Sequence, residues 1–377
     1  MNIALPWYSW MFMGLPIRGQ GGPSFNTPHQ PFTSGEAFQG ERHPGFVQAV
    51  VLAGGIGSRL RPWTDTVPKP LLPMLDRTLL EQVVWGMPEG VVDEIIVAGG
   101  YRVDQITNHF SAKEQGLDVT IVEETEPLGT GGALGNCRDV VSGRFACFNG
   151  DVVTSLRVED LIDLHQHNGG VGTLALWEVE DPTRFGIVGI DSTQRVTQFK
   201  EKPKSSEVFS NLINAGSYLL EEEVFDVMPI GRHSLERDVF PVLAERGELN
   251  GLPFDGYFID AGTPASWSEG VEACIAHGRF NRGRVVDGSW CAEASAPVGA
   301  RHHGSMFGRG VSAHGATVER STLLDGVRVG EGSVLNGVLA GQGAVVGTDC
   351  VLRDVVLGPG AVVEDGERLI GERRAAS

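Results

Sequence analysis

Residues 52–74 read LAGGIGSRLRPWTDTVPKPLLPM and directly follow the apolar run QAVV at 48–51. A short β-branched run that ends in glycines predicts a buried strand followed by a tight turn. Glycines let the backbone approach a ligand closely, and successive N–H groups can then form an anion-binding nest. Arg59 and Arg61 add fixed positive charge that suits bidentate phosphate contacts. The segment therefore predicts a phosphate-binding loop, although it is neither a GK[ST] loop nor GxGxxG.

A lysine between two prolines follows this loop, in the segment Pro68-Lys69-Pro70. Flanking prolines stiffen the backbone, which would hold the Lys69 ammonium in place beside a ligand. The chain has five lysines among its 30 basic residues, so a lysine in such a setting is notable. The alternative interpretation is a lysine on a surface loop.

On the C-terminal side of the loop, short Val/Ile-rich runs alternate with helical patterns as far as about residue 280. The runs predicted as strands are 48–55, 92–101, 117–124, 145–151 and 171–179, and those predicted as helices are 79–87, 103–110 and 158–168. This alternation predicts an α/β fold with a mixed, mostly parallel, Rossmann-like sheet flanked by helices. His165 and His167 on the last helix are spaced i,i+2, so they face apart and are expected at the surface.

The chain as a whole divides into four segments. Residues 1–45 are rich in Gly, Pro, Ser and Gln and are expected to be a disordered extension, or to follow an unused upstream start. Residues 46–282 form the α/β domain. Over 283–368, apolar residues followed by glycine or other small residues recur every five or six positions, which predicts a parallel β-helix with three short strands per coil rather than an irregular β region. Residues 369–377 are expected to be a loose tail.

Composition excludes several classes of protein. The net charge of −18 argues against nucleic acid as the main partner. No apolar run is long enough to cross a membrane, and the apolar start lacks the basic region and cleavage site of a signal peptide. Five cysteines without a CxxC pair are typical of a reduced cytoplasmic protein.

Together with motifs further along the chain, segment 52–74 resembles the signature of the sugar-1-phosphate nucleotidylyltransferases, the enzymes that make NDP-sugars. The further motifs are EPLGTGGA at 126–133, NGD at 149–151, FGIV at 185–188, FKEKP at 199–203, NAG at 214–216, SLERDVFP at 234–241 and YFIDAGTP at 257–264. Tyr257 and Ala261 depart from the family pattern at packing positions. The resemblance extends from residue 47 to the end of the β-helix, which it implies to be left-handed and built of hexapeptide repeats.

The resemblance implies attack of a sugar 1-phosphate on the α-phosphorus of an NTP, with release of pyrophosphate. It assigns catalysis to Arg59, Lys69 and Lys202. It assigns nucleotide binding to Leu52, Ala53, Gly54, Gly55, Gly57, Ser58, Gly129 and Thr130. It assigns substrate binding to Gly150, Glu201, Asn214 and Glu236. It assigns the Mg²⁺ cofactor to Asp151 and Asp260.

Within the family, the sequence is most like the mannose-1-phosphate guanylyltransferase branch, with GTP as the expected nucleotide. Valienol-type cyclitol-1-phosphate guanylyltransferases of aminocyclitol biosynthesis, and glucose-1-phosphate thymidylyl- or uridylyltransferases, are the alternatives. A non-catalytic regulatory paralogue and a second, acyltransferase activity using His302, His303 or His314 are the rival interpretations. A homo-oligomer joined through the β-helix is expected.

Overall fold

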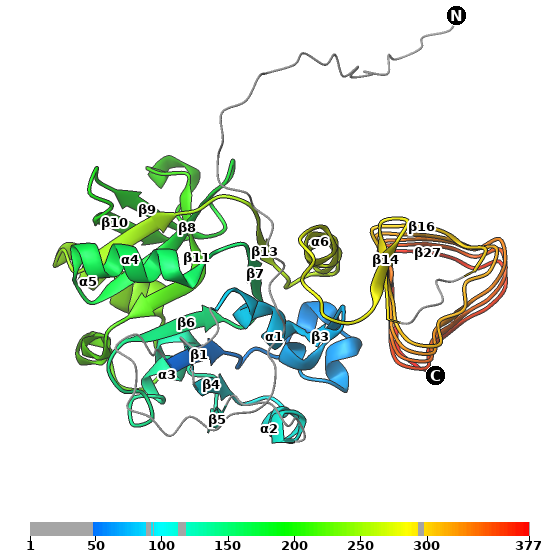
Figure 1. Cartoon of the computed structure of the whole chain (residues 1–377), viewed down its shortest axis with the longest axis horizontal. Coiled ribbons are helices and arrows are strands. Elements are labelled where there is room, and N and C mark those ends of the chain that lie inside the picture. The colour runs from blue at the N-terminus through cyan, green and yellow to red at the C-terminus, as the bar shows by residue number, and fades with distance from the viewer. Residues whose placement is uncertain (1–47, 88–91, 93, 112–117, 293–297, 377) are drawn as a thin grey trace, which may run out of the picture. The chain divides into compact units, whose positions relative to one another are not determined.

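The structure is a computed structural model and describes residues 48–87, 92, 94–111, 118–292 and 298–376. The predicted extension at 1–45 lies outside the described residues. The described chain forms an α/β part followed by a β-solenoid (Figure 1). No helix among the described residues is both long and apolar enough to span a membrane.

The α/β part is built on one mixed sheet with the strand order β10-β9-β11-β6-β1-β4-β5, with β8 beside β11 and β12 beside β8. The segment β6-β1-β4-β5 is parallel, and β11 joins it in antiparallel orientation. The strands are β1 (Gln48–Leu52), β4 (Glu94–Gly99), β5 (Asp118–Glu123), β6 (Phe145–Asn149), β8 (Gly172–Glu178), β9 (Gly186–Ile190), β10 (Val196–Glu201), β11 (Leu212–Leu220) and β12 (Leu249–Pro253). The predicted fold class is confirmed.

Both faces of the parallel segment are buried, as its continuous apolar runs predict. In β1, Ala49 and Val51 pack into one apolar cluster, while Val50 between them packs into another. In β4, Ile96 likewise faces the cluster of Val50. Successive side chains of a strand point to opposite faces, so two cores, one on each side, hold this sheet.

Helices cover both cores. They are α1 (Leu79–Val83), α2 (Val103–Ser111), α3 (Gly129–Gly135), α4 (Val158–Asn168), α5 (Phe240–Glu245) and α6 (Pro264–Ala276). A capping box starts α1: Thr78 N donates to Glu81 Oε2 at 2.8 Å, and Glu81 N donates to Thr78 Oγ1 at 3.3 Å. Helix α4 packs on β8, β11 and β12 (Figure 1).

The expected surface position of His165 on α4 is wrong. Its side chain is buried, with Nδ1 2.9 Å from Thr173 Oγ1 and Nε2 3.0 Å from Glu221 Oε1. His167 is exposed. The i,i+2 spacing does turn the two rings apart. His167 faces solvent, but His165 faces β8.

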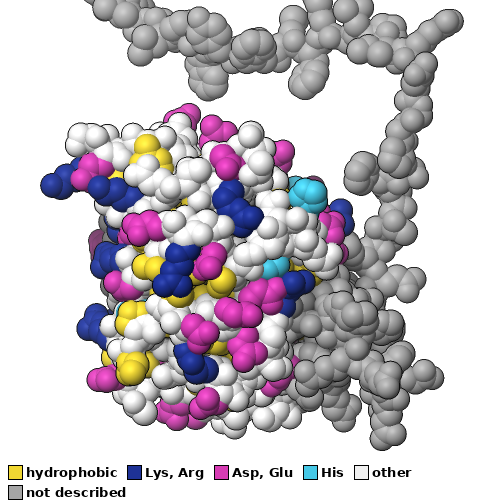
Figure 2. Space-filling view, turned by 90° about the vertical axis from the view of Figure 1, so that its left-hand side faces the viewer, with side chains coloured by type: hydrophobic (Ala, Val, Ile, Leu, Met, Phe, Trp, Pro, Cys, Tyr) yellow, Lys and Arg dark blue, Asp and Glu magenta, His cyan; other side chains and the backbone are white. Residues whose placement is uncertain are grey.

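The surface of the α/β part on the side of α5 and β10 mixes charges of both signs. Figure 2 shows Lys and Arg interspersed with Asp and Glu on this face, with small, scattered hydrophobic patches between them. This face therefore carries no broad basic surface of the kind that nucleic acid requires.

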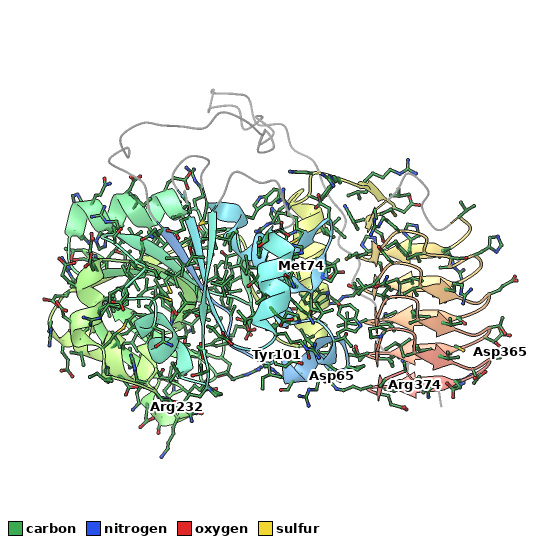
Figure 3. The ribbon with its side chains drawn as sticks, turned by 90° about the horizontal axis from the view of Figure 1, so that it is seen from below. Asp65, Met74, Tyr101, Arg232, Asp365 and Arg374 are labelled. Carbon is green, nitrogen blue, oxygen red and sulfur yellow. The ribbon has the colours of Figure 1, made fainter. Side chains whose placement is uncertain are left out.

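The solenoid stacks short parallel strands into three sheets, β14-β15-β17-β19-β22-β25-β28, β16-β18-β21-β24-β27 and β20-β23-β26. Thr317 pairs with Val334 and Val334 with Val351, a repeat of 17 residues per coil. Figure 1 looks along the stack, where the coils form a triangular outline, and Figure 3 shows the coils from the side. The architecture is consistent with the left-handed β-helix that was predicted.

The first sheet contains β14 (Arg284–Val286), β15 (Ser289–Cys291), β17 (Met306–Phe307), β19 (Thr322–Leu323), β22 (Leu339–Ala340), β25 (Val356–Leu357) and β28 (Arg373–Arg374). The second contains β16 (Arg301–His303), β18 (Thr317–Glu319), β21 (Val334–Asn336), β24 (Val351–Arg353) and β27 (Arg368–Ile370). The third contains β20 (Arg328–Val329), β23 (Val345–Val346) and β26 (Val362–Val363).

The expected loose tail at 369–377 does not begin at 369. Strand β27 pairs with β24 through Ile370, and β28 pairs with β25 through Arg374. The change to a charged composition there follows from exposure of the last coil and does not end the pairing.

Candidate functional site

The phosphate-loop prediction concerns the turn that follows β1. Gly57 has φ +67°, and a Cβ there would lie 3.0 Å from Thr64 Cγ2 and 3.1 Å from Lys69 Cβ. Both the backbone conformation and the crowding therefore require glycine at this position. The loop continues into a 3-10 turn, η1 (Ser58–Leu60), in which Leu60 N donates to Gly57 O at 2.9 Å.

The other predicted nucleotide contacts of this loop differ in exposure. Ala53 is buried and its N–H donates to Ala98 O at 2.7 Å, which attaches the start of the loop to β4. Gly55 and Ser58 are exposed, and so is Arg59. The tip of the loop is therefore open to a ligand, while its base is fixed to the sheet.

Lys69 is buried in the short turn η3 (Lys69–Leu71), with 7% of its surface exposed. Its Nζ lies 2.7 Å from Oδ2 of Asp151, whose side chain is 35% exposed. Asp151 directly follows Gly150, at the carboxyl end of β6. A buried ammonium requires a compensating anion, and Asp151 supplies it.

Asp260 reaches the same place through a second, small sheet. Strand β13 (Phe258–Asp260) pairs in antiparallel orientation with β7 (Val152–Thr154), so Asp260 lies opposite Val152. In addition, Ala261 N donates to Asp151 O at 2.9 Å. This ladder brings Asp151 and Asp260 together although they lie far apart in the chain.

The electrostatics of Asp260 reflect this crowding. Burial raises the pKa of its carboxyl, the negative charge of Asp151 raises it further, and the charges of Lys69 and Arg59 oppose the shift. The backbone N–H of Gly262 beside the carboxyl also lowers this pKa, but Oδ1 is buried and has no hydrogen-bond partner of good geometry among the described residues. A Cβ at Gly262 would lie 2.7 Å from both this oxygen and Nη2 of Arg59, so that position holds a glycine between the two charged groups.

The donor set fits a magnesium ion. Mg²⁺ binds through one or two carboxylates and takes its other ligands from water and phosphate oxygens. Asp151 and Asp260 supply two adjacent carboxylates, and the buried Oδ1 of Asp260 makes no hydrogen bond of good geometry with the described residues. No group of three or more His, Cys, Asp or Glu side chains suited to a metal occurs in the described part of the chain. A closed, all-protein metal cage is therefore absent from those residues.

A second polar cluster contains the predicted substrate residue Glu236. Its Oε2 accepts hydrogen bonds from Thr130 Oγ1 at 2.7 Å and from Ser234 Oγ at 2.6 Å. Glu236 lies in a π-helical turn, η7 (Leu235–Val239), and such turns are frequent at functional sites. Thr130 in turn accepts from Leu235 N at 3.0 Å, so this cluster connects the glycine-rich helix α3 to the turn.

Asn214 and Glu201 belong to the same cluster through Tyr218. Asn214 Nδ2 donates to Tyr218 Oη at 2.9 Å. Burial raises the pKa of Tyr218, and the nearby charges of Glu236 and Glu201 raise it further. Lys202 forms an ion pair with Glu201 at 3.2 Å, has φ +46°, and keeps 58% of its side chain exposed.

The two clusters meet where β11 pairs with β6. Gly216 has φ +67°, and a Cβ there would lie 2.6 Å from Asn149 Nδ2. The Oδ1 of Asn149 is buried and has no hydrogen-bond partner among the residues that the structure describes. Gly150 N donates to Leu52 O at 2.9 Å, which brings the end of β6 against the start of the phosphate loop. The loop, the paired aspartates and the Glu236 cluster therefore surround one region at the carboxyl edge of the parallel strands.

Sequence reasoning missed three residues of this region. Tyr218 on a buried strand could not be distinguished from a core aromatic. His233 O accepts from Gly131 N at 3.1 Å and Gly132 N at 3.3 Å, which fixes the start of α3. The carboxylate of Glu124 would lie 2.7 Å from a Cβ at Gly54. The signal for Glu124 was its place directly after a strand, which an acidic run obscured.

Comparisons with known proteins support the division into an α/β part and a repeat region, and they identify related proteins. Residues 48–276 match the family model described as nucleotidyl transferase, and residues 292–376 match that described as GlmU-like, C-terminal hexapeptide. The mannose-1-phosphate guanyltransferase of Saccharomyces cerevisiae is 34% identical over 232 residues, 60% of this chain and 64% of that protein. A probable mannose-1-phosphate guanylyltransferase 2 of Oryza sativa is 33% identical over 67% of this chain and 73% of its own length. The chain thus spans less than two thirds of the yeast protein.

Solved structures show the same fold. HddC from Yersinia pseudotuberculosis, complexed with GMP-PN, superposes with a TM-score of 0.51 at 28% identity, over 60% of this chain and 99% of that one. A putative glucose-1-phosphate thymidylyltransferase from Bacillus anthracis gives a TM-score of 0.53 at 26% identity, over 63% and 98% of the two chains.

Proposed function

The chain belongs to the nucleotidyl transferase family, and we propose that it joins a sugar 1-phosphate to a nucleoside triphosphate and releases pyrophosphate. The observation that carries the proposal is the cluster of Lys69, Asp151, Asp260 and Arg59 beside a glycine-rich loop. Two cationic side chains and two carboxylates in one place suit a reaction in which phosphate groups are held and exchanged.

The reaction asks this chain mainly for positioning and charge. An oxygen of the sugar 1-phosphate attacks the α-phosphorus, a new P–O bond forms, and the bond to the pyrophosphate oxygen breaks. The attacking phosphate is already ionised, so no general base is required. Arg59 would bind the triphosphate from the loop, and Lys69 would place its charge beside the same phosphates. Lys202 would meet the sugar phosphate from the end of β10.

Asp151 and Asp260 would hold the Mg²⁺. The ion, when bound, supplies positive charge that neutralises phosphate oxygens. Lys69 orients Asp151 through their ion pair, and the ladder between β7 and β13 fixes Asp260 beside it. The raised pKa of Asp260 is consistent with a site in which a further positive charge is needed.

Glu124 supports GTP as the nucleotide. Its carboxylate adjoins the glycine loop at Gly54 and accepts from Leu128 N at 3.3 Å, so it lies between the two nucleotide segments. An ionised carboxylate only accepts hydrogen bonds. Guanine offers two adjacent donors, N1–H and N2–H, whereas uracil and thymine offer one N–H between two carbonyl oxygens. A carboxylate at this place therefore favours guanine.

The proposed acceptor is mannose 1-phosphate, which the names of the yeast and rice relatives support. Glu201, Asn214 and Glu236 would bind its hydroxyl groups, and the Gly150 backbone would approach the ring closely. A cyclitol 1-phosphate offers the same hydroxyl and phosphate groups, so it stays the alternative.

The test is pyrophosphate release by the purified protein with Mg²⁺, crossing four NTPs with the 1-phosphates of mannose, glucose and valienol. We expect turnover with GTP and mannose 1-phosphate. A preference for dTTP or UTP would overturn the guanylyl proposal, and activity with valienol 1-phosphate alone would change the acceptor. Absence of turnover in all mixtures would favour a regulatory paralogue.

A variant sharpens the nucleotide test. Glu124→Gln replaces one acceptor oxygen by a donor amide and should lower kcat/KM for GTP roughly tenfold, the effect of about one lost hydrogen bond to a charged group. The control is Glu126→Gln in the same segment, an exposed side chain that should leave the GTP preference unchanged. An unchanged GTP preference in Glu124→Gln would remove the argument from Glu124.

A further inference from the structure

The last coil of the solenoid touches the phosphate loop. Arg373 on β28 donates from Nη1 to the backbone oxygen of Arg59, and also to that of Arg61 at 2.9 Å. One guanidinium group thus holds two carbonyl groups of the segment that immediately follows the glycines. No side chain of the loop takes part in this contact.

Two further contacts bring the neighbouring coil, which contains β25, against the same loop segment. Trp63 Nε1 donates to Leu357 O at 2.9 Å, and the indole is 2% exposed. A Cβ at Gly358 would lie 3.0 Å from Pro62 Cγ, so the two backbones are close. Residues 59–63 are therefore held along their length by β25 and β28.

The solenoid is a firm support for these contacts. Strand β28 is attached to β25 by hydrogen bonds from Val356 N to Glu372 O at 2.9 Å and from Gly358 N to Arg374 O at 2.7 Å. Strand β25 is in turn paired with β22. Each coil is fixed by its neighbour, so the Arg373 backbone has a defined position relative to the whole stack.

The side chain of Arg59, in this same segment, faces the proposed reaction centre. The Arg59 guanidinium lies beside Gly262 and Asp260, because a Cβ at Gly262 would be 2.7 Å from Arg59 Nη2. Its carbonyl is held by Arg373 on the other side. Displacement of the carbonyl would therefore move the side chain that meets the triphosphate.

We propose that Arg373 is a positioning residue, which fixes the phosphate loop from the solenoid and so sets the affinity for the nucleotide. This inference rests on the proposed function. Arg373 is exposed, so its removal should cost little global stability. Its two acceptors both lie in the loop, so the loss should appear there.

Arg374 is the matched control, since it is the next residue on the same strand. It donates to Val362 O at 3.2 Å and to Glu367, both within the solenoid. Figure 3 labels it on the last coil, on the side of the stack opposite Asp365. A change at Arg374 removes a guanidinium from the same coil and leaves the loop contacts in place.

The experiment compares Arg373→Ala, Arg373→Lys and Arg374→Ala in the full chain by two readouts. Steady-state kinetics should show KM for GTP raised about tenfold in Arg373→Ala, with KM for the sugar phosphate unchanged, because misplacement of a binding group is costly. Arg373→Lys, which keeps a donor, should recover part of the loss, and Arg374→Ala should behave like the unaltered protein.

Amide hydrogen exchange of the peptide spanning 54–64 is the second readout and does not depend on turnover. It should be faster in Arg373→Ala than in Arg374→Ala, while the melting temperatures of the two stay alike. Equal exchange in the two variants, or a KM for GTP that does not change, would overturn the proposal. If the unaltered protein has no turnover, the proposed function fails, and exchange alone decides whether Arg373 holds the loop.

Discussion

The solenoid and the α/β part both bury polar groups, and the way they do so differs. In the solenoid the same group recurs: Ser305 N donates to Ser289 Oγ at 3.2 Å, and Ser321 N donates to Ser305 Oγ at 3.1 Å. In the α/β part, the buried Lys69 and the crowded Asp260 each occur once. A buried polar group that repeats in successive coils serves the architecture. A buried charged group that occurs at a single place needs another reason, and here that reason is chemistry.

The comparison of the two regions predicts that, of the three substitutions considered, the one at Lys69 has the largest effect, and that this effect is on activity. Lys69→Met keeps the apolar stem and removes the charge beside Asp151. We expect kcat/KM for GTP to fall by about 10²–10³, as when one electrostatic group of an active site is removed. Pyrophosphate release measures it, with thermal melting as the check on folding. A loss below about fivefold in an intact protein would mean that Lys69 is structural.

The second largest effect is expected from a substitution in the solenoid core, which should lower the stability of the protein. Leu352 on β24 is fully buried in the solenoid core. Leu352→Ala should lower the free energy of unfolding by about 2–5 kcal/mol, because it leaves a cavity in a packed core. Urea unfolding measures it. Activity per folded molecule should stay the same, and a specific loss of kcat would break the separation of roles between the two regions.

The smallest effect concerns His165 and pH. Burial lowers the pKa of His165 below its usual 6.5, although Glu221 opposes the shift. The unfolded chain therefore binds this proton first as the pH falls, so the free energy of unfolding should decrease as the pH falls through about 6.5 and below. His165→Gln should reduce this dependence in urea unfolding at several pH values, and the exposed His167→Gln should not. Equal dependence in both variants would contradict the assignment.

Much of the fold could be predicted because it follows from local patterns. The strand–helix alternation, the glycines of 52–74 and the repeat beyond 283 each appear within a short window of the sequence. The end of the solenoid could not be predicted from the repeat, because the outer coil exchanges apolar residues for charges at 368–374 while its backbone pairing continues.

The candidate site was less accessible to sequence reasoning. Lys69 was visible between its prolines. The approach of Asp260 to Asp151 depends on a ladder between β7 and β13, whose register no local pattern reveals. Glu124 and Tyr218 could be assigned to the site only from their neighbours in the structure. Glu124 lies beside Gly54, and Tyr218 accepts a hydrogen bond from Asn214.

The Trp63 contact has a consequence for dividing this chain. Trp63 lies in one apolar cluster with Trp267 of the α/β part and with Met306, Leu339 and Val356 of the solenoid. A chain cut after α6 would expose these apolar surfaces to water and leave the indole N–H without its acceptor. The two regions match separate family models, yet they are not interchangeable modules. Grafting this α/β part onto another scaffold would require a new partner for Trp63 first.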